Sequence, residues 1–162
     1  MSKESSSAEI ASQIINKNVA LAAGVGLLPV PVVDFVGISL INLNMLRELA
    51  DTYGVPFSEN LGKTMVASLL AGLGAGRLAV MGVASVAKFL PGLGTAFSAI
   101  ALPTFAAAST YAIGRVFDIH FRVGGNFFDF NLKSKQEELK YFYEEGRKAA
   151  LADMEAKAAA AC

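Results

Sequence analysis

Asp34 and Arg77 are the residues of this sequence best placed to do chemistry, because each is ionisable and lies within an apolar segment. Between residues 18 and 46, Asp34 is the only charged residue; between residues 64 and 114, only Arg77 and Lys88 carry charge. Such charges are costly in a bilayer and face protein, water or an opposite charge. One interpretation is a water-lined ion or proton path. The favoured one is structural: Asp34 braces a bend and Arg77 reaches a lipid phosphate.

Other motifs that carry chemistry are incomplete. Gly62-Lys63-Thr64 resembles the end of a phosphate-binding loop, but Phe57 stands where that motif requires its first glycine. His120 is the single histidine and has no second clear metal ligand, so we predict no metal site. The scattered carboxylates form neither an acid and base pair nor a nucleophile arrangement. The sequence therefore predicts a protein that is not an enzyme, with no catalytic residues and no cofactor.

Gly72 and Gly76 form a Gly-x-x-x-Gly pair, which is typical of close helix packing. Small residues let two helix backbones approach in lipid, where van der Waals contact replaces the hydrophobic driving force. We expect these glycines to pack against another helix of the same chain. The alternative partner is the same helix of a second copy.

Two Leu-Pro breaks divide the apolar sequence into helical arms. Proline removes a backbone N–H and clashes with the preceding turn, so a helix cannot pass through these points undisturbed. The break residues are Pro29 and Pro31 in the first case, and Pro91, Gly92 and Gly94 in the second. Each apolar block is therefore predicted to be two helices folded back on one another.

The second apolar block is long enough to embed in a membrane. Residues 89–114 contain no charged residue, whereas about 20 apolar residues suffice to cross a bilayer core. Pro103 interrupts this stretch and is expected to bend the helix. We therefore predict that the hairpin containing Pro91 is the membrane anchor.

The first arm is predicted to be amphipathic and interfacial or re-entrant, because its uncharged part is short for a full crossing. Its apolar residues at helical spacing are Ile10, Ile14, Leu21, Val25 and Leu28. Serine, glutamine, asparagine and lysine residues occupy the other faces.

The predicted fold class is all-α: an integral membrane protein of two proline-broken helical hairpins and a C-terminal amphipathic soluble helix. Residues 1–162 form a single domain in this interpretation. Its parts are a polar helix start at 1–17, hairpin 1 at 18–54, hairpin 2 at 58–122 and the last helix at 131–161. The N-terminus, the connection between the hairpins and the C-terminal region are expected on one side of the membrane, the cytoplasmic side.

Composition agrees with membrane contact and argues against nucleic acid. The chain has 162 residues, 54% of them hydrophobic, and a formal net charge of zero. Its lysines and arginines are dispersed, so no basic face is available to attract a phosphate backbone. We therefore predict a lipid bilayer as the main partner and no binding to nucleic acid.

The ordered motifs of this chain resemble those of the bacterial membrane domain known as domain of unknown function 697, often fused behind Era-like GTPase domains. The resemblance covers roughly residues 18–122 and rests on Pro29-x-Pro31-x-x-Asp34, Met45…Leu49-Ala50-x-x-Tyr53-Gly54, Lys88-Phe89-Leu90-Pro91-Gly92-Leu93-Gly94 and Thr110-x-x-x-Gly114. It implies an all-helical, membrane-associated domain of a bacterial inner or intracellular membrane, and coupling to a GTPase partner. This chain departs from the fused members because it contains no nucleotide-binding domain.

The preferred functional hypothesis is a non-enzymatic membrane-embedded protein that forms homo-oligomers or organises and remodels membrane, serving a separate GTPase. One alternative is a small ion channel or transporter that uses Asp34 and Arg77. A second alternative is a soluble helical bundle that inserts into membrane on demand.

Overall fold

The computed structural model describes residues 2–27, 31–74 and 94–161, with side chains described from Ser5, Val36 and Ile100 onward in these three stretches. Every regular element in these stretches is a helix, which confirms the predicted all-α class. The helices are α1 (Ser2–Val25), α2 (Pro31–Tyr53), α3 (Glu59–Gly74), α5 (Gly94–Arg122) and α6 (Gln136–Ala160). The integral-membrane architecture stays a prediction.

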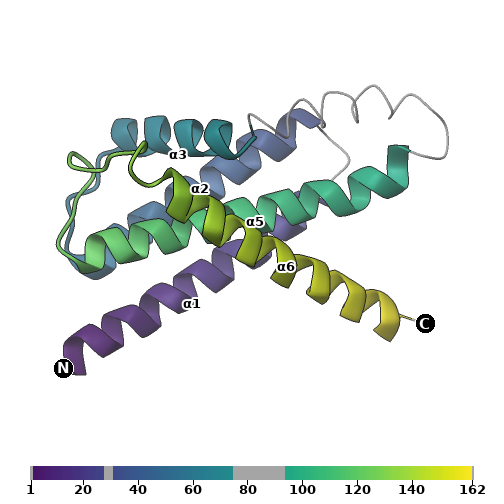
Figure 1. Cartoon of the computed structure of the whole chain (residues 1–162), viewed down its shortest axis with the longest axis horizontal. Coiled ribbons are helices and arrows are strands. Elements are labelled where there is room, and N and C mark those ends of the chain that lie inside the picture. Colours follow the sequence, from purple (N-terminus) through teal and green to yellow (C-terminus); the bar gives the residue numbers. More distant parts are fainter. Residues whose placement is uncertain (1, 28–30, 75–93, 162) are drawn as a thin grey trace.

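Helices α1 and α2 run antiparallel and form a hairpin (Figure 1). Pro31, one of the predicted break residues, is the first residue of α2, where its missing N–H and fixed φ suit a helix start. The two helices approach closely near the bend, because a Cβ added to Gly37 would lie 2.8 Å from Cγ1 of Val25. Pro29 lies outside the described residues.

Helix α2 ends in a glycine turn that leads to α3. Gly54 adopts a φ of +68°, which favours glycine, and the N–H of Val55 donates to the carbonyl of Ala50 at 2.8 Å. This turn places α3 beside α2. It also brings Phe57 of the connection toward the C-terminal end of α5, where it meets Phe127 edge to face.

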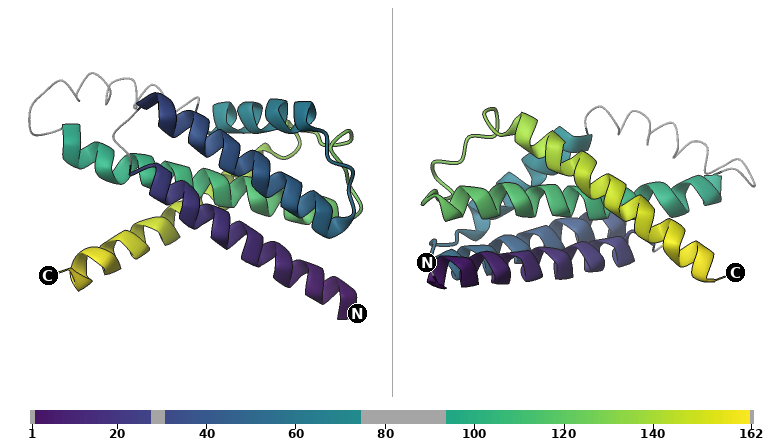
Figure 2. Two further views of the ribbon diagram at one scale, coloured as in Figure 1. Left: turned by 180° about the vertical axis from the view of Figure 1, so that it is seen from behind. Right: turned by 60° about the horizontal axis from the view of Figure 1, so that its bottom comes forward.

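Helix α5 is the central helix of the fold. Figure 2 shows it between the α1–α2 hairpin on one side and α6 on the other. Glycines allow this close packing, since a Cβ on Gly114 would lie 2.8 Å from Cγ1 of Ile15 in α1. Near its N-terminal half, α5 approaches the end of α1, because a Cβ on Gly26 would lie 2.8 Å from the Cα of Pro103. The helix continues through Pro103 without ending.

One described segment, Ile100–Arg122 within α5, is long and apolar enough to cross a membrane. Its most apolar window has a mean hydropathy of 1.2, and 72% of that window is buried by the rest of the protein. In this conformation α5 is therefore covered by its own chain. The predicted anchoring role of the second hairpin stays a prediction.

Helix α6 begins at Gln136, five residues later than the predicted start at 131, because Asn131 and Ser134 fold the preceding residues into turns. Its buried face consists of Leu139, Phe142, Tyr143 and Gly146, and it packs across α5. The helix then runs back along the bundle, so the C-terminus lies at the opposite end from the N-terminus (Figure 1). The predicted placement of both termini on one side of a membrane stays a prediction.

The helical character of the first arm is confirmed, but its predicted apolar stripe does not form the core. The buried stripe lies one position further along, at Ala11, Ile15, Asn18 and Ala22. Ile10 and Leu21 stay about half exposed. The arm packs on α5 through Ile15 and leaves part of the predicted apolar stripe at the surface.

Hairpin 2 is described in part. Helix α3 and helix α5 are its described arms, and Gly94, a predicted break residue, is the first residue of α5. Arg77, Pro91 and Gly92 fall between these helices, outside the described residues.

Candidate functional site

The side chains considered below lie at the two ends of the helix bundle, which are called the tip and the base. The tip is the end where α1 ends, α2 begins and α5 begins. The base is the opposite end, where α2 and α5 end and α3 and α6 begin, with the connections 54–58 and 123–135.

Exposed apolar side chains gather at the tip. Leu21 and Leu27 come from the end of α1, and Val36 and Leu40 come from the first turns of α2; between 53% and 63% of each is exposed. These four residues are called the tip surface below. Ile100, in the first turns of α5, is also half exposed at this end. Scattered apolar residues are ordinary on a protein surface, whereas neighbouring ones that form a patch mark a contact site. Val123 and Phe128, in the connection after α5 at the base, are also exposed, at 78% and 79%.

The same hairpin is polar toward the base. On α2, the exposed face that carries Val36 and Leu40 continues through Asn44, Arg47 and Asp51. Lys17 of α1 forms an ion pair with Glu48 of α2 at 2.7 Å on this surface. The outer face of the α1–α2 hairpin therefore changes from charged to apolar along its length.

A buried carboxylate holds the base together. Asp118 of α5 is fully buried, and its Oδ2 accepts hydrogen bonds from Arg122 at 2.7 Å and from Arg115 at 3.1 Å. Its Oδ1 accepts a hydrogen bond from the Tyr53 hydroxyl of α2 at 2.6 Å. These four residues are called the base clamp. Because both arginines belong to α5, Tyr53 is the member that ties α2 to α5.

The environment of Tyr53 keeps its hydroxyl protonated. Burial raises its pKa above the usual value of 10.0, and the hydrogen bond to the Asp118 carboxylate raises it further, since a phenolate beside that carboxylate would be repelled. The hydroxyl therefore stays a donor at neutral pH, as the clamp requires.

Aromatic rings pack around the clamp. Phe117 is fully buried and stacks on Phe130 with ring centroids 4.4 Å apart, and Phe127 and Phe121 pack against it. The loop that delivers Phe127 and Phe130 begins at Gly124, whose φ is +88°. This turn closes α5 with a hydrogen bond from the N–H of Gly125 to the carbonyl of His120 at 2.9 Å.

His120 contacts two residues of this loop through its imidazole ring. Its Nε2 lies 2.9 Å from Oδ1 of Asp129 and 3.0 Å from the carbonyl of Asn126. The Asn126 backbone N–H donates to Asp129 and holds the pKa of that carboxyl below its usual value of 3.8. Among the described residues, no group of three histidine, cysteine, aspartate or glutamate side chains is arranged to hold a metal ion.

The residues singled out in the sequence are placed as follows. Asp34 lies in the first turns of α2, where the structure describes the backbone alone, and Arg77 lies outside the described residues, so their pairing stays a prediction. Gly72 is exposed, and a Cβ there would meet no atom within 4 Å. Its partner Gly76 lies outside the described residues, so their packing role also stays a prediction.

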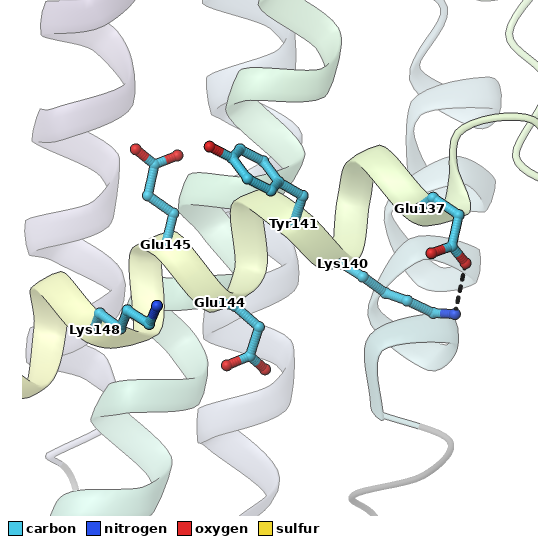
Figure 3. A pocket seen from close by; sticks show the side chains of 6 residues that line it. All are labelled: Glu137, Lys140, Tyr141, Glu144, Glu145 and Lys148. Carbon is cyan, nitrogen blue, oxygen red and sulfur yellow. Dashed lines mark hydrogen bonds and ion pairs between the residues drawn. The ribbon is translucent and has the colours of Figure 1, made fainter.

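A shallow hollow of about 480 Å³ lies along the outer face of α6. Its lining residues all belong to that helix: Glu137, Lys140, Tyr141, Glu144, Glu145 and Lys148. Figure 3 shows Tyr141 and Glu145 pointing to one side of the helix, whereas Lys140 and Glu144 point to the other. These side chains do not converge on a common centre, so the hollow is not a developed binding site.

Sequence reasoning missed the base clamp, although part of its signal is readable. Arg115, Asp118 and Arg122 stand three and four residues apart, which places them together on one face of a helix. The contribution of Tyr53 could not be read this way, because it comes from a helix 65 positions earlier in the chain.

The fold defines a small all-α protein whose α1–α2 hairpin is charged toward the base and apolar toward the tip. The chain belongs to the family named domain of unknown function (DUF697), whose sequence profile matches residues 2–146. The resemblance inferred from the sequence motifs is therefore confirmed. The chain is 39% identical over 153 residues to Magnetosome membrane protein 22 of Magnetospirillum gryphiswaldense, covering 94% of this chain and 77% of that protein. No solved structure matches the chain.

Proposed function

We propose that this protein is a non-enzymatic, membrane-associated protein that attaches to a bilayer through the tip surface and there organises the membrane. The observation that carries the proposal is that the exposed large apolar side chains of the α1–α2 hairpin, apart from Ile10, gather at its tip. Burying such side chains in lipid is favourable by about 25 cal/mol per Å² of apolar area. Further support comes from the relative described as a magnetosome membrane protein.

The position of α6 determines how a bilayer meets this conformation. Helix α6 covers one side of α5 and carries exposed charged residues such as Asp153 and Lys157 toward the tip end. A bilayer therefore lies against the outer face of the α1–α2 hairpin, opposite α6. The protein first docks on the bilayer in this conformation, in which α5 is covered by its own chain.

Vesicle flotation tests the docking surface. The double variant Leu21→Gln/Leu40→Gln removes apolar area from the tip surface without touching the core, and we expect it to reduce vesicle binding at least tenfold. The matched control is Ile10→Gln, because Ile10 is a half-exposed apolar residue of the same helix α1 but lies toward the base. Equal loss of binding in both variants would contradict the proposal.

A second candidate is the bundle that inserts on demand, and the burial of α5 favours it. The most apolar window of α5 is 72% covered by the rest of the protein, as expected for a stored membrane segment. Alkaline carbonate separates the two candidates, because it releases a docked bundle from membranes, whereas an inserted α5 stays with the lipid.

We further propose that the protein forms homo-oligomers on the membrane, which would let a small protein organise a larger area. A separate GTPase partner would control this self-association. Mass measurement of the vesicle-bound protein tests the self-association.

A channel that uses Asp34 and Arg77 is the third hypothesis. Ion flux into vesicles, compared between the parent chain and the Asp34→Asn and Arg77→Gln proteins, tests it.

A further inference from the structure

Contacts between α2 and α5 change in kind from the base to the tip. At the base, the Tyr53 hydroxyl donates to the buried carboxylate of Asp118 at 2.6 Å, and the Tyr53 ring packs on Phe121 with centroids 6.4 Å apart. A hydrogen bond to a buried charge is among the stronger contacts in a protein, at about 1.5–3 kcal/mol. The two helices are therefore tied at this end.

At the middle of the bundle, the polar contact between the same helices is incomplete. Nδ2 of Asn42 in α2 donates to Oγ1 of Thr110 in α5 at 3.1 Å and to the carbonyl of Ile38 at 2.8 Å. The Oδ1 atom of Asn42 is buried and accepts no hydrogen bond. The clamp also contains a buried atom without a partner, Nε of Arg115. The contact of Asn42 with Thr110 is nevertheless the weaker tie between α2 and α5, because it joins two neutral groups whereas Tyr53 donates to a carboxylate.

At the tip, the described contacts between the hairpin and α5 are apolar. Gly26 lies directly against the backbone of Pro103, and the neighbouring Leu27, Val36 and Ile100 are already half exposed. In water these contacts are held by the hydrophobic effect. In lipid that driving force disappears, because acyl chains are as apolar as the side chains they replace.

We infer that the α1–α2 hairpin opens away from α5 at the tip when it meets a bilayer, while the Tyr53–Asp118 contact holds the base closed as a hinge. This inference rests on the proposed function and describes how that membrane contact is controlled. Lipid weakens the apolar contacts at the tip, whereas α2 and α5 are joined at the base by the hydrogen bond from Tyr53 to the buried Asp118 carboxylate. The opened bundle exposes the apolar segment of α5 to the acyl chains.

Distances between spin labels on the full-length chain test the hinge. In a Cys162→Ser background, one label pair replaces Gly24 and Ile100 across the tip, and a second replaces Asp51 and Val123 across the base. All four positions are exposed and none belongs to the tip surface, so the labels leave the core and the docking residues intact. Pulsed electron resonance is measured in buffer and on vesicles of equal parts phosphatidylcholine and phosphatidylglycerol.

The expected result is a tip distance that grows by roughly 10 Å, about one helix diameter, on vesicles, with the base distance unchanged. Vesicle-bound protein in which neither distance grows overturns the opening and leaves the docking proposal standing. Growth of both distances overturns the hinge. Protein that fails to float with vesicles overturns the docking proposal and this inference together.

The Tyr53→Phe variant tests the clamp itself, because it keeps the ring contact with Phe121 and removes the hydroxyl donor. We expect its base distance to widen on vesicles and to stay unchanged in buffer. Tyr141→Phe is the matched control, since it removes the hydroxyl of an exposed tyrosine on α6 and is expected to behave as the parent chain. A Tyr53→Phe protein whose base stays closed on vesicles would overturn the assignment of Tyr53 as the hinge.

Discussion

At the base of the bundle, a fully buried carboxylate accepts hydrogen bonds from Tyr53, Arg115 and Arg122, and stacked aromatic rings surround it. At the tip, leucine and valine side chains stand more than half exposed, and the helices meet through glycine and proline. Helices α2 and α5 run parallel and extend from the tip to the base. At the base the helices are joined by a hydrogen bond to the buried Asp118 carboxylate. At the tip they are joined by apolar contacts, which contacts with acyl chains can replace.

We therefore expect the base to determine the stability of the fold and the tip to determine membrane binding. Changes at the base are expected to lower the free energy of unfolding with little direct effect on lipid contact. Changes on the tip surface are expected to alter membrane binding with little effect on unfolding, since surface substitutions usually change it by less than about 0.5 kcal/mol.

The largest effect on stability is expected at the aromatic cluster of the base. Phe117→Ala removes a fully buried ring that stacks on Phe130, and we expect the free energy of unfolding in urea to fall by about 4 kcal/mol. Phe128→Ala, at a phenylalanine of the same end that is 79% exposed, is the control and is expected to be nearly neutral. Equal losses in the two proteins would show that the cluster does not stabilise the base.

Loss of the clamp carboxylate comes next. Asp118→Asn leaves two arginines without their buried counter-charge, and both are about one third exposed, so we expect a loss of about 2 kcal/mol rather than the full cost of a buried unpaired charge. The comparison protein is Asp153→Asn, whose exposed ion pair with Lys157 is expected to contribute less than about 1 kcal/mol. Urea denaturation measures both, and similar values would argue against the clamp.

At the tip, the glycine that meets α5 is expected to be sensitive by a smaller amount. A Cβ on Gly26 would lie 2.8 Å from the Cα of Pro103, so Gly26→Ala must shift the backbone and is expected to cost about 1–2 kcal/mol. Gly24→Ala is the matched control, because a Cβ there meets nothing within 4 Å and alanine favours the helix. Thermal unfolding of the two variants should therefore shift in opposite directions, and a shared direction would contradict the close contact.

The smallest effect concerns acid stability of the base loop. Because the folded pKa of Asp129 is lowered below 3.8, its contribution is present above that value and disappears as the pH falls through the folded pKa. Asp129→Asn should therefore lose less stability than the parent between neutral and strongly acidic pH. The midpoint of urea unfolding, measured at several pH values for both proteins, gives the difference. If the midpoints of the two proteins change in parallel with pH, the Asp129 carboxylate does not stabilise the loop.

The helices and the bend at Pro31 follow from local rules, which is why the sequence predicts them well. Proline and glycine act on their own turn of the chain, and the buried residues Leu139, Phe142 and Tyr143 of α6 follow the helical period. The buried stripe of α1 lies one position away from the predicted one because Ile15 packs against Gly114 of α5, whereas the large Ile10 and Leu21, which a hydrophobicity pattern favours, stay about half exposed.

The base clamp and the return of α6 along the bundle depend on contacts distant in sequence. Tyr53 contacts Asp118 because α2 and α5 pack side by side. The two residues are 65 positions apart, so no local sequence pattern predicts their contact. Arg77, Pro91 and Gly92 fall outside the described residues, so the predicted charge pair and membrane anchor stay predictions.

Lipid quenching along one helix face tests the central claim most directly. A fluorophore is attached at Leu40→Cys near the tip or at Asp51→Cys near the base, in a Cys162→Ser background, and vesicles contain lipids brominated on their acyl chains. Both positions lie on the exposed outer face of α2. The account predicts strong quenching at position 40 and little at position 51. Equal quenching at both positions, or none at position 40 in vesicle-bound protein, would contradict it.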